Sequence, residues 1–191
     1  MFGKILIALI VIVAAFVIMV ATRPVEFHIE RSIAVAALPA NIFAQVNDLH
    51  AWAAWSPWEK LDPNMEKTYG GPPVGPGATY EWKSDSGKVG QGRMTIEKSE
   101  APTQVVVKLE FIKPFAATNT VTFNIDSTAD GAKVTWAMDG RNGFMGKAFG
   151  LFMNMDKTVG GDFERGLTGL KAVAEVAPKP AAAVAGGAAL Q

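Results

Sequence analysis

The chain has 191 residues, with 18 lysines and arginines against 18 aspartates and glutamates, so its formal net charge is zero. This balance argues against a nucleic-acid partner, which normally requires a basic face. With no cysteine and only two histidines, the chain excludes disulfides, thiolate metal sites, cysteine nucleophiles and a three-histidine zinc site, and we predict neither a metal nor a cofactor.

An uninterrupted apolar segment stands near the N-terminus. Residues Ile5 to Ala21 are 17 consecutive apolar residues between Lys4 and Arg23, and as a helix they would be roughly 25 Å long, the short end of a bilayer crossing. A cleaved signal peptide and a buried soluble helix are the alternatives, although a cut after Ala21 would place a methionine where signal peptidase prefers a small residue. We predict an uncleaved, single-pass membrane anchor over residues 1–24.

The residues on either side of this segment indicate on which side of a membrane the domain would lie. A short N-terminus, followed by a domain without cysteine, suits a bacterial inner-membrane protein whose domain is exported. Lys4 stands before the segment and Arg23 after it, so the positive-inside rule leaves both sides of the membrane open.

Directly after the segment, apolar residues alternate with polar ones, which is typical of a half-buried strand. In residues 25–35 the apolar side chains, beginning with Phe27, share one face, and His28 lies on the opposite face and is expected to point to water. Pro39 opens a helical stretch that runs to residue 46, and a second short helix is predicted over residues 49–55.

The middle of the chain predicts an antiparallel meander. Short turns rich in Gly, Pro, Asp and Ser separate runs of alternating apolar residues, and such short connections join antiparallel neighbours. The glycines at 90 and 92 lie inside one run and predict a bulge or bend. The predicted strands are Glu66–Tyr69, Ala78–Ser84, Val89–Ser99, Thr103–Ile112, Ala117–Ser127 and Ala132–Gly140.

Helical spacing returns in residues 144–176, where apolar residues form one broad stripe that includes Phe149, Phe152 and Phe163. We predict a single long helix there, bent near Gly160-Gly161. Residues 177–191 are an Ala/Pro-rich tail of low complexity and are expected to be disordered. The predicted fold class is therefore α+β, with an anchor (1–24), one folded domain (25–176) and a tail (177–191).

Several short motifs fall within this order of elements: Leu38-Pro39-Ala40-Asn41-Ile42-Phe43, Trp52-Ala53-Ala54-Trp55-Ser56-Pro57-Trp58, Gly77-Ala78-Thr79-Tyr80-Glu81-Trp82, Gly90-Gln91-Gly92-Arg93-Met94-Thr95-Ile96 and Gly166-Leu167-Thr168-Gly169-Leu170-Lys171. Together they resemble the helix-grip fold of the START-like (SRPBCC) superfamily, in particular its polyketide cyclase/dehydrase and lipid-transport branch. The resemblance spans roughly residues 25–176. It implies a curved antiparallel sheet wrapped on a long C-terminal helix, with a hydrophobic ligand between them. Some members of the superfamily catalyse cyclisation or hydrolysis. The membrane anchor is an addition to that domain.

Ligand-binding candidates come from the inward faces of the predicted strands, from the tryptophans of residues 52–58 and from the long helix. A sheet curved around one helix often leaves an apolar gap, and Met and Phe linings adapt to flexible ligands; a completely filled core, with the tryptophans as a plug, is the alternative. The candidates are Trp52, Trp55, Tyr80, Trp82, Met94, Val107, Leu109, Phe123, Trp136, Met138, Phe149, Phe152 and Met153.

Catalytic candidates are few. His50 lies where the two short helices join and titrates in the right range for a general base, while Tyr80 and Arg93 could enter the pocket from the sheet. Asp139 and Arg141, at the end of the last strand, could form an ion pair with Arg93 or hold a ligand carboxylate. No paired carboxylates or nucleophile–base set emerges from the sequence.

Three functions remain open. The first is a membrane-anchored, noncatalytic module that binds a hydrophobic small molecule or lipid, and the scarcity of titratable groups favours it. The second is an enzyme of cyclase, dehydratase or hydrolase type that uses His50, Tyr80 or Arg93. The third is an envelope module that contacts an unknown protein partner through the long helix or the tail.

Overall fold

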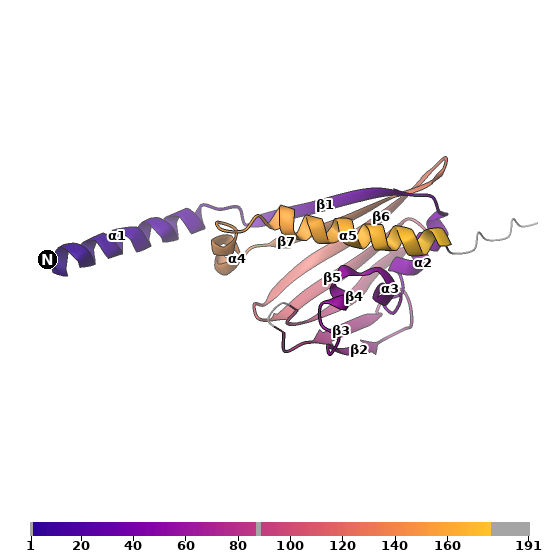
Figure 1. Cartoon of the computed structure of the whole chain (residues 1–191), viewed down its shortest axis with the longest axis horizontal. Helices are drawn as coiled ribbons and strands as arrows, with labels where there is room; N and C mark the ends of the chain where they lie inside the picture. Colours follow the sequence, from indigo (N-terminus) through magenta and orange to yellow (C-terminus); the bar gives the residue numbers. More distant parts are fainter. Residues whose placement is uncertain (1, 87–88, 177–191) are drawn as a thin grey trace, which may run out of the picture.

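The computed structural model describes residues 2–86 and 89–176, so the predicted tail at 177–191 lies outside the described residues. Figure 1 shows an isolated N-terminal helix that leads into a sheet crossed by a long helix. The helices are α1 (Phe2–Ala21), α2 (Pro39–Val46), α3 (Trp52–Trp55), the 3-10 helix η1 (Pro57–Lys60), α4 (Phe144–Phe149) and α5 (Met155–Val176). The strands are β1 (Glu26–Val35), β2 (Glu66–Gly70), β3 (Thr79–Lys83), β4 (Gln91–Glu100), β5 (Gln104–Lys113), β6 (Ala117–Thr128) and β7 (Gly131–Arg141).

The seven strands form one antiparallel sheet in the order β1-β7-β6-β5-β4-β3-β2. Strands β2 to β7 are a meander, and β1 closes the order by pairing with β7 along its whole length. The register of β4 on β5 shifts between Gln91 and Gly92, as the glycine pattern predicts. This arrangement confirms the predicted α+β helix-grip architecture.

The C-terminal helix differs from its prediction. The structure has two helices, because α4 ends at Phe149 and α5 begins at Met155. The side-chain Oδ1 of Asn154 accepts the backbone N–H of Lys157 at 2.9 Å, which caps the new N-terminus. Helix α5 continues without a break through Gly160 and Gly161, and a Cβ at Gly160 would collide with the Arg31 guanidinium. Glycine here permits close packing.

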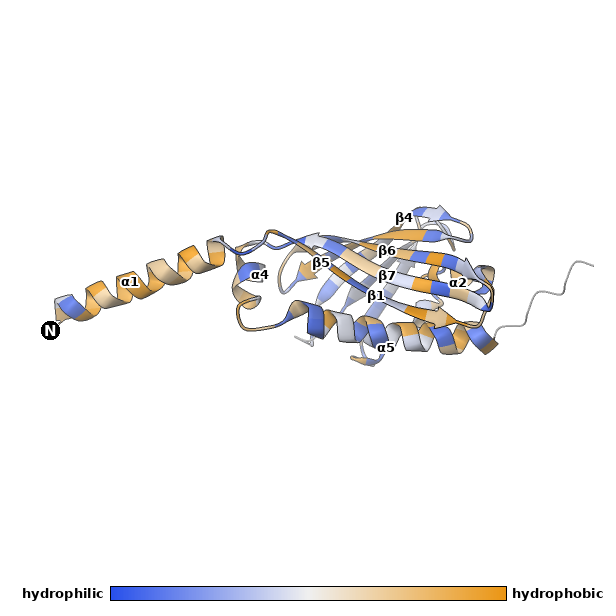
Figure 2. Ribbon diagram, turned by 90° about the horizontal axis from the view of Figure 1, so that it is seen from above, coloured by the Kyte–Doolittle hydropathy of each residue, from blue (hydrophilic) through white to orange (hydrophobic). Residues whose placement is uncertain are grey.

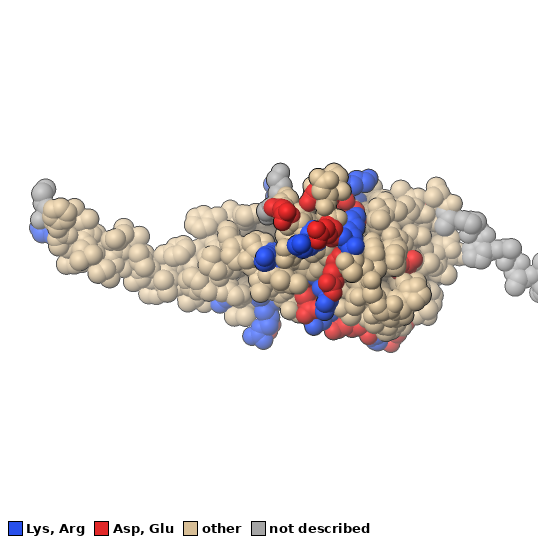
Figure 3. Space-filling model, turned by 90° about the horizontal axis from the view of Figure 1, so that it is seen from below, with Lys and Arg blue, Asp and Glu red and all other residues tan. Residues whose placement is uncertain are grey.

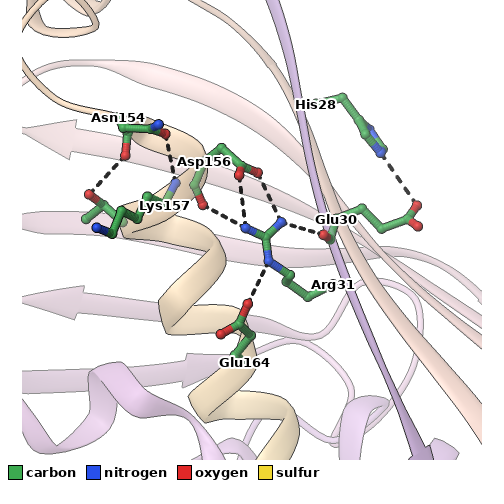
Figure 4. A network of polar contacts seen from close by, with 8 residues as sticks. His28, Glu30, Arg31, Asn154, Asp156, Lys157 and Glu164 are labelled. Carbon is green, nitrogen blue, oxygen red and sulfur yellow. Dashed lines mark hydrogen bonds and ion pairs between the residues drawn. The ribbon is translucent and has the colours of Figure 1, made fainter.

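Arg31 joins β1 to α5 through a network of charge-assisted hydrogen bonds (Figure 4). Its Nη1 and Nη2 each donate to the Asp156 carboxylate at 3.0 Å, and its Nε donates to Glu164 at 2.9 Å. Such a forked contact orients both partners. Arg31 shares the face of β1 that meets α5, and its side chain is only 25% exposed. The network therefore holds the long helix over the edge of the sheet.

Asp156 makes the stability given by this network sensitive to acid. Hydrogen bonds from Arg31 lower the pKa of the Asp156 carboxyl below its ordinary value. A lowered folded-state pKa contributes stability that is present above the unfolded pKa, about 4, and is lost as pH falls through the folded value. We expect the urea midpoint of Asp156→Asn to be lower than that of the wild type at neutral pH. Below about pH 4 the wild-type midpoint should fall more steeply with pH than the midpoint of the variant. Asp130→Asn, in the β6–β7 turn, is the matched control; equal slopes in all three proteins would contradict the prediction.

The N-terminal helix stands apart from the sheet. Among the described residues α1 is the one helix long and apolar enough to cross a membrane, with a mean hydropathy of 3.0 over the best window, 6% of which is buried. A signal sequence passes the same test. Figure 2 shows it apolar along nearly its whole length. Four residues, 22–25, separate its end from β1, so the C-terminal end of α1 lies close to the start of the sheet.

Candidate functional site

The half of the concave face farthest from α1 is filled by aromatic rings. Trp136 of β7 stacks on Phe163 of α5 with ring centroids 4.4 Å apart, and Phe123 of β6 lies 4.8 Å from Trp136. Trp52 and Trp55 of α3 lie edge-on to both sheet rings and are at most 4% exposed. We call these five residues the aromatic plug.

The indole groups of the plug are committed to the protein itself. Trp52 Nε1 donates to the Val46 carbonyl at 3.1 Å, and Trp55 Nε1 donates to the Gln45 carbonyl at 3.4 Å. These carbonyls belong to the last turn of α2, whose C=O groups lack helical partners. A ligand would therefore have to displace packed rings to reach Trp52, Trp55, Phe123 or Trp136, four of the predicted ligand-binding residues.

The other half of the concave face, toward α1, is less covered. Strand pairing aligns Tyr80, Met94, Leu109 and Asn119 in one row across β3 to β6. Helix α5 packs instead on β1 and on the short helices. Leu109, Trp82 and Phe111 remain partly exposed although β3 and β5 are interior strands of the sheet, and Phe27 on the edge strand β1 is partly exposed as well. We call this half the open floor; its side chains are Phe27, Tyr80, Trp82, Met94, Leu109, Phe111, Asn119 and Met138.

Two glycines let large rings lie flat on the open floor. A Cβ at Gly140 would come within 2.6 Å of the Phe27 ring and would also strike Asn119 Oδ1. A Cβ at Gly92 would collide with the Trp82 ring and with the Glu110 carbonyl oxygen. Glycine is thus required at both positions by close approach. The result is a low, aromatic surface.

Two polar groups face this surface. Asn119 is 6% exposed, and its Oδ1 has no hydrogen-bond partner within residues 2–86 and 89–176. A buried acceptor without a donor costs free energy, so a ligand N–H or O–H placed there would be favoured. At the other end of the row, the Tyr80 hydroxyl donates to Glu59 Oε1 at 2.8 Å, and Lys67 Nζ pairs with the same carboxylate.

Tyr80 is held in its neutral form. Burial, followed by its hydrogen bond to the Glu59 carboxylate, raises the pKa of the Tyr80 hydroxyl well above its ordinary value. The Glu59 side chain is itself only 7% exposed. The phenol proton is therefore directed at the buried Glu59 carboxylate, and the Tyr80 oxygen is left as a hydrogen-bond acceptor at the edge of the open floor.

The other two catalytic candidates lie away from this surface. His50 is on the outside with its side chain 56% exposed, bonded to Asp48 and stacked on Tyr69 at 4.0 Å. Arg93 lies on the convex face, where its Nε donates to Glu81 at 2.8 Å. The prediction that Arg93 enters the pocket is wrong because its position in β4 is out of phase with Met94.

At the end of the last strand, Asp139 pairs with His28 and not with Arg93. Asp139 Oδ1 lies 2.7 Å from Nδ1 of His28, so Asp139 pairs with that histidine across β1 and β7. His28 is more than half exposed, as the strand pattern predicts.

Three predicted lining residues lie outside the concave face. Phe149 ends α4, and Phe152 and Met153 belong to the connection to α5; they are 44%, 79% and 49% exposed. Their predicted place on a stripe facing the sheet is wrong because that stripe assumed one unbroken helix. Val107 and Met138 lie buried on the concave face between the plug and the row of Tyr80.

Sequence reasoning missed two polar residues of the site. Asn119 alternates in step with the apolar residues of its strand, and this spacing could have predicted that its side chain lies on the concave face. Glu59 follows a tryptophan in a single turn of 3-10 helix, where no periodicity marks it as buried. No group of three or more His, Cys, Asp or Glu in the described ranges has the arrangement of a metal site.

Two open hollows lie on the outside of the described structure. One is beside Gly161 and Arg165 on α5, and the other runs along α1. Neither includes a residue of the concave face.

Comparison with known proteins identifies similar sequences and folds. A family model described as polyketide cyclase/dehydrase and lipid transport matches residues 26–175. No curated protein sequence matches the chain.

Solved structures share the fold at low identity. A crystal structure from Chromobacterium violaceum is 13% identical, with a TM-score of 0.55 over 80% of this chain and 99% of that one. A solution structure from Thermobifida fusca is 18% identical, with a TM-score of 0.58 over 75% and 90%. The di-domain ARO/CYC protein StfQ of the steffimycin biosynthetic pathway is 10% identical, with a TM-score of 0.58; the match covers 79% of this chain and 52% of StfQ.

Proposed function

The chain belongs to the polyketide cyclase/dehydrase and lipid transport family, and on that basis we propose that it is a membrane-anchored protein that holds a hydrophobic small molecule or lipid on its open floor without transforming it. In this proposal α1 is an uncleaved anchor, residues 25–176 are the binding domain, and the domain is exported across a bacterial inner membrane.

The observation that carries the proposal is the contrast between the two halves of the concave face. The plug buries its rings almost completely, whereas Trp82, Leu109 and Phe111 stay partly exposed on interior strands. Partly exposed aromatic and aliphatic side chains around a few fixed polar groups are typical of sites for apolar ligands. The unpartnered Oδ1 of Asn119 favours a ligand that carries one hydrogen-bond donor on an otherwise apolar body.

Native mass spectrometry of the full chain, released from detergent micelles, tests the proposal. We expect a retained mass of a few hundred daltons after incubation with a total lipid extract. Leu109→Trp should abolish it by filling the floor, while Lys108→Trp, the neighbouring residue on the opposite face of β5, should retain it. The absence of a retained mass in the wild type, or equal occupancy in both variants, would rule out the open floor as the site.

A second candidate function has one specific observation in its favour. The buried Tyr80–Glu59 pair places beside the proposed ligand a phenol oxygen whose own proton is donated to a carboxylate. That oxygen could take a proton from a polyketone carbon while the Tyr80 proton passes to Glu59, the base-catalysed step that begins a cyclisation. StfQ is named as an ARO/CYC protein. If this function holds, Tyr80→Phe should lower turnover of a polyketone substrate by roughly 100-fold or more while ligand retention persists. Turnover unchanged in Tyr80→Phe would exclude the hydroxyl as the proton relay to Glu59.

A further inference from the structure

An apolar surface surrounds the point where α1 meets the domain. Helix α4, the connection to α5 and the turn between β5 and β6 all lie at this end, because β1 begins here and pairs with the end of β7. Their side chains project into solvent, and Phe115 of the turn lies 5.6 Å from Phe149 of α4 between ring centroids. We call this surface the collar; it consists of Ile112, Phe115, Phe144, Phe149, Phe152 and Met153, each at least 44% exposed.

The collar is in contact with the end of the apolar helix. Lys147 of α4 donates from Nζ to the carbonyl oxygen of Ala21, the last residue of α1, at 3.3 Å. Val20 is the one buried residue of α1, and it lies at the end that contacts α4. If α1 crosses a bilayer, these contacts hold α4 at the depth where the span leaves the hydrocarbon.

The charge of the collar suits the headgroup region. Residues 142–155 and 112–116 contain Lys147 and Lys113 as their only charged residues, and no acid. On the face shown in Figure 3, charged side chains gather over the middle of the domain, and the stretch toward α1 is almost free of them. Apolar segments with aromatic residues and a few lysines are those that lie in a membrane interface.

We infer that the collar is a second membrane contact, in which α4, the residues after it and the β5–β6 turn insert into the headgroup region of the leaflet that α1 enters. This inference rests on the proposed membrane anchor. It gives the domain a fixed orientation, with one end of the open floor near the headgroups, because Phe111 on the floor and Ile112 in the collar are consecutive residues of β5 whose side chains point to opposite faces. A ligand could then pass between bilayer and floor without crossing water.

Site-directed fluorescence tests the inference, and the natural absence of cysteine makes each introduced thiol unique. Single variants Phe152→Cys and Phe115→Cys probe the collar, Val11→Cys probes the middle of α1, and Thr128→Cys probes the exposed far end of the domain. Each full-length protein is labelled with an environment-sensitive dye and reconstituted in phosphatidylcholine vesicles containing a quarter phosphatidylglycerol. Lipids carrying a doxyl quencher just below the headgroup, or deep in the acyl chain, are added in parallel.

We expect the shallow quencher to act several-fold more strongly on both collar labels than on the Thr128 label, and the deep quencher to act on the Val11 label. Quenching at Val11 with none at the collar would overturn the inference and leave the anchor intact. No quenching at Val11 would overturn the anchor itself. Unquenched collar labels, together with disulfide-linked dimers of Phe152→Cys protein left unlabelled, would assign the surface to a second copy of the chain instead.

Discussion

Trp136→Ala is expected to lower the free energy of unfolding by about 3–5 kcal/mol, the range measured for large aromatic side chains removed from protein cores. Trp136 is 1% exposed, and it contacts rings from α3, β6 and α5 together. Its removal would leave a cavity that the neighbouring rings cannot fill without losing their own contacts. Because small domains are stable by only about 5–15 kcal/mol, the variant should lie close to the limit of folding.

Urea unfolding of the full chain measures this loss, with the Trp136→Phe variant beside it. The indole N–H of Trp136 has no acceptor among the described residues, so phenylalanine removes an unsatisfied donor while it keeps most of the ring contacts. We expect Trp136→Phe to lose much less than Trp136→Ala. Phe152→Ala, which removes an exposed ring, should stay within about 0.5 kcal/mol of the wild type. Similar midpoints for the two Trp136 variants would mean that the ring packing of the plug contributes little.

The second large effect is expected at Gly166, where α5 crosses the plug. A Cβ at this position would lie 2.6 Å from Trp136 Cζ3 and 3.1 Å from Cδ of Pro57. Trp136 cannot retreat because Phe123 and Trp52 pack on it from the other elements. Overpacking of this kind costs about 1–3 kcal/mol, and we expect Gly166→Ala to be destabilised by that order even though alanine favours the helix.

Gly161 of the same helix supplies the matched control. Only Arg165 Nη1, at 3.8 Å, comes near a Cβ built there. Gly161→Ala should therefore gain the helix propensity of alanine, up to about 1 kcal/mol. Opposite signs for the two substitutions, measured by the midpoint of thermal unfolding at one protein concentration, are the expected result. Stabilisation by both would show that α5 sits farther from Trp136 than the contacts given above.

The strands could be predicted closely because their side chains alternate and their turns are short. The predicted strand Ala117–Ser127 is one residue shorter than β6, which is Ala117–Thr128. The predicted strand Thr103–Ile112 is shifted by one residue from β5, which is Gln104–Lys113. The break between α4 and α5 could not be predicted in the same way. Apolar spacing continues across it, and the cap from Asn154 depends on a backbone conformation that spacing does not reveal.

The candidate site was predictable only in part, since a strand pattern gives the face of a residue but not its neighbours across the sheet. Met94 and Leu109 were assigned to the inward face, and strand pairing brings them side by side. The partners of Arg31 lie 125 and 133 residues away in the chain. Whether a ring ends in the plug or on the open floor depends on the position of α5, which no local pattern encodes.

The short connection between α1 and the sheet limits how far the domain can move from α1. Residues 22–25 span at most about 14 Å when extended. If α1 is the proposed anchor, so short a connection would prevent the domain from reaching a second membrane as a freely diffusing shuttle does. The proposed ligand would then be bound and released at the surface of the membrane that holds α1. Such a protein would store its ligand at one membrane and would not carry it between membranes.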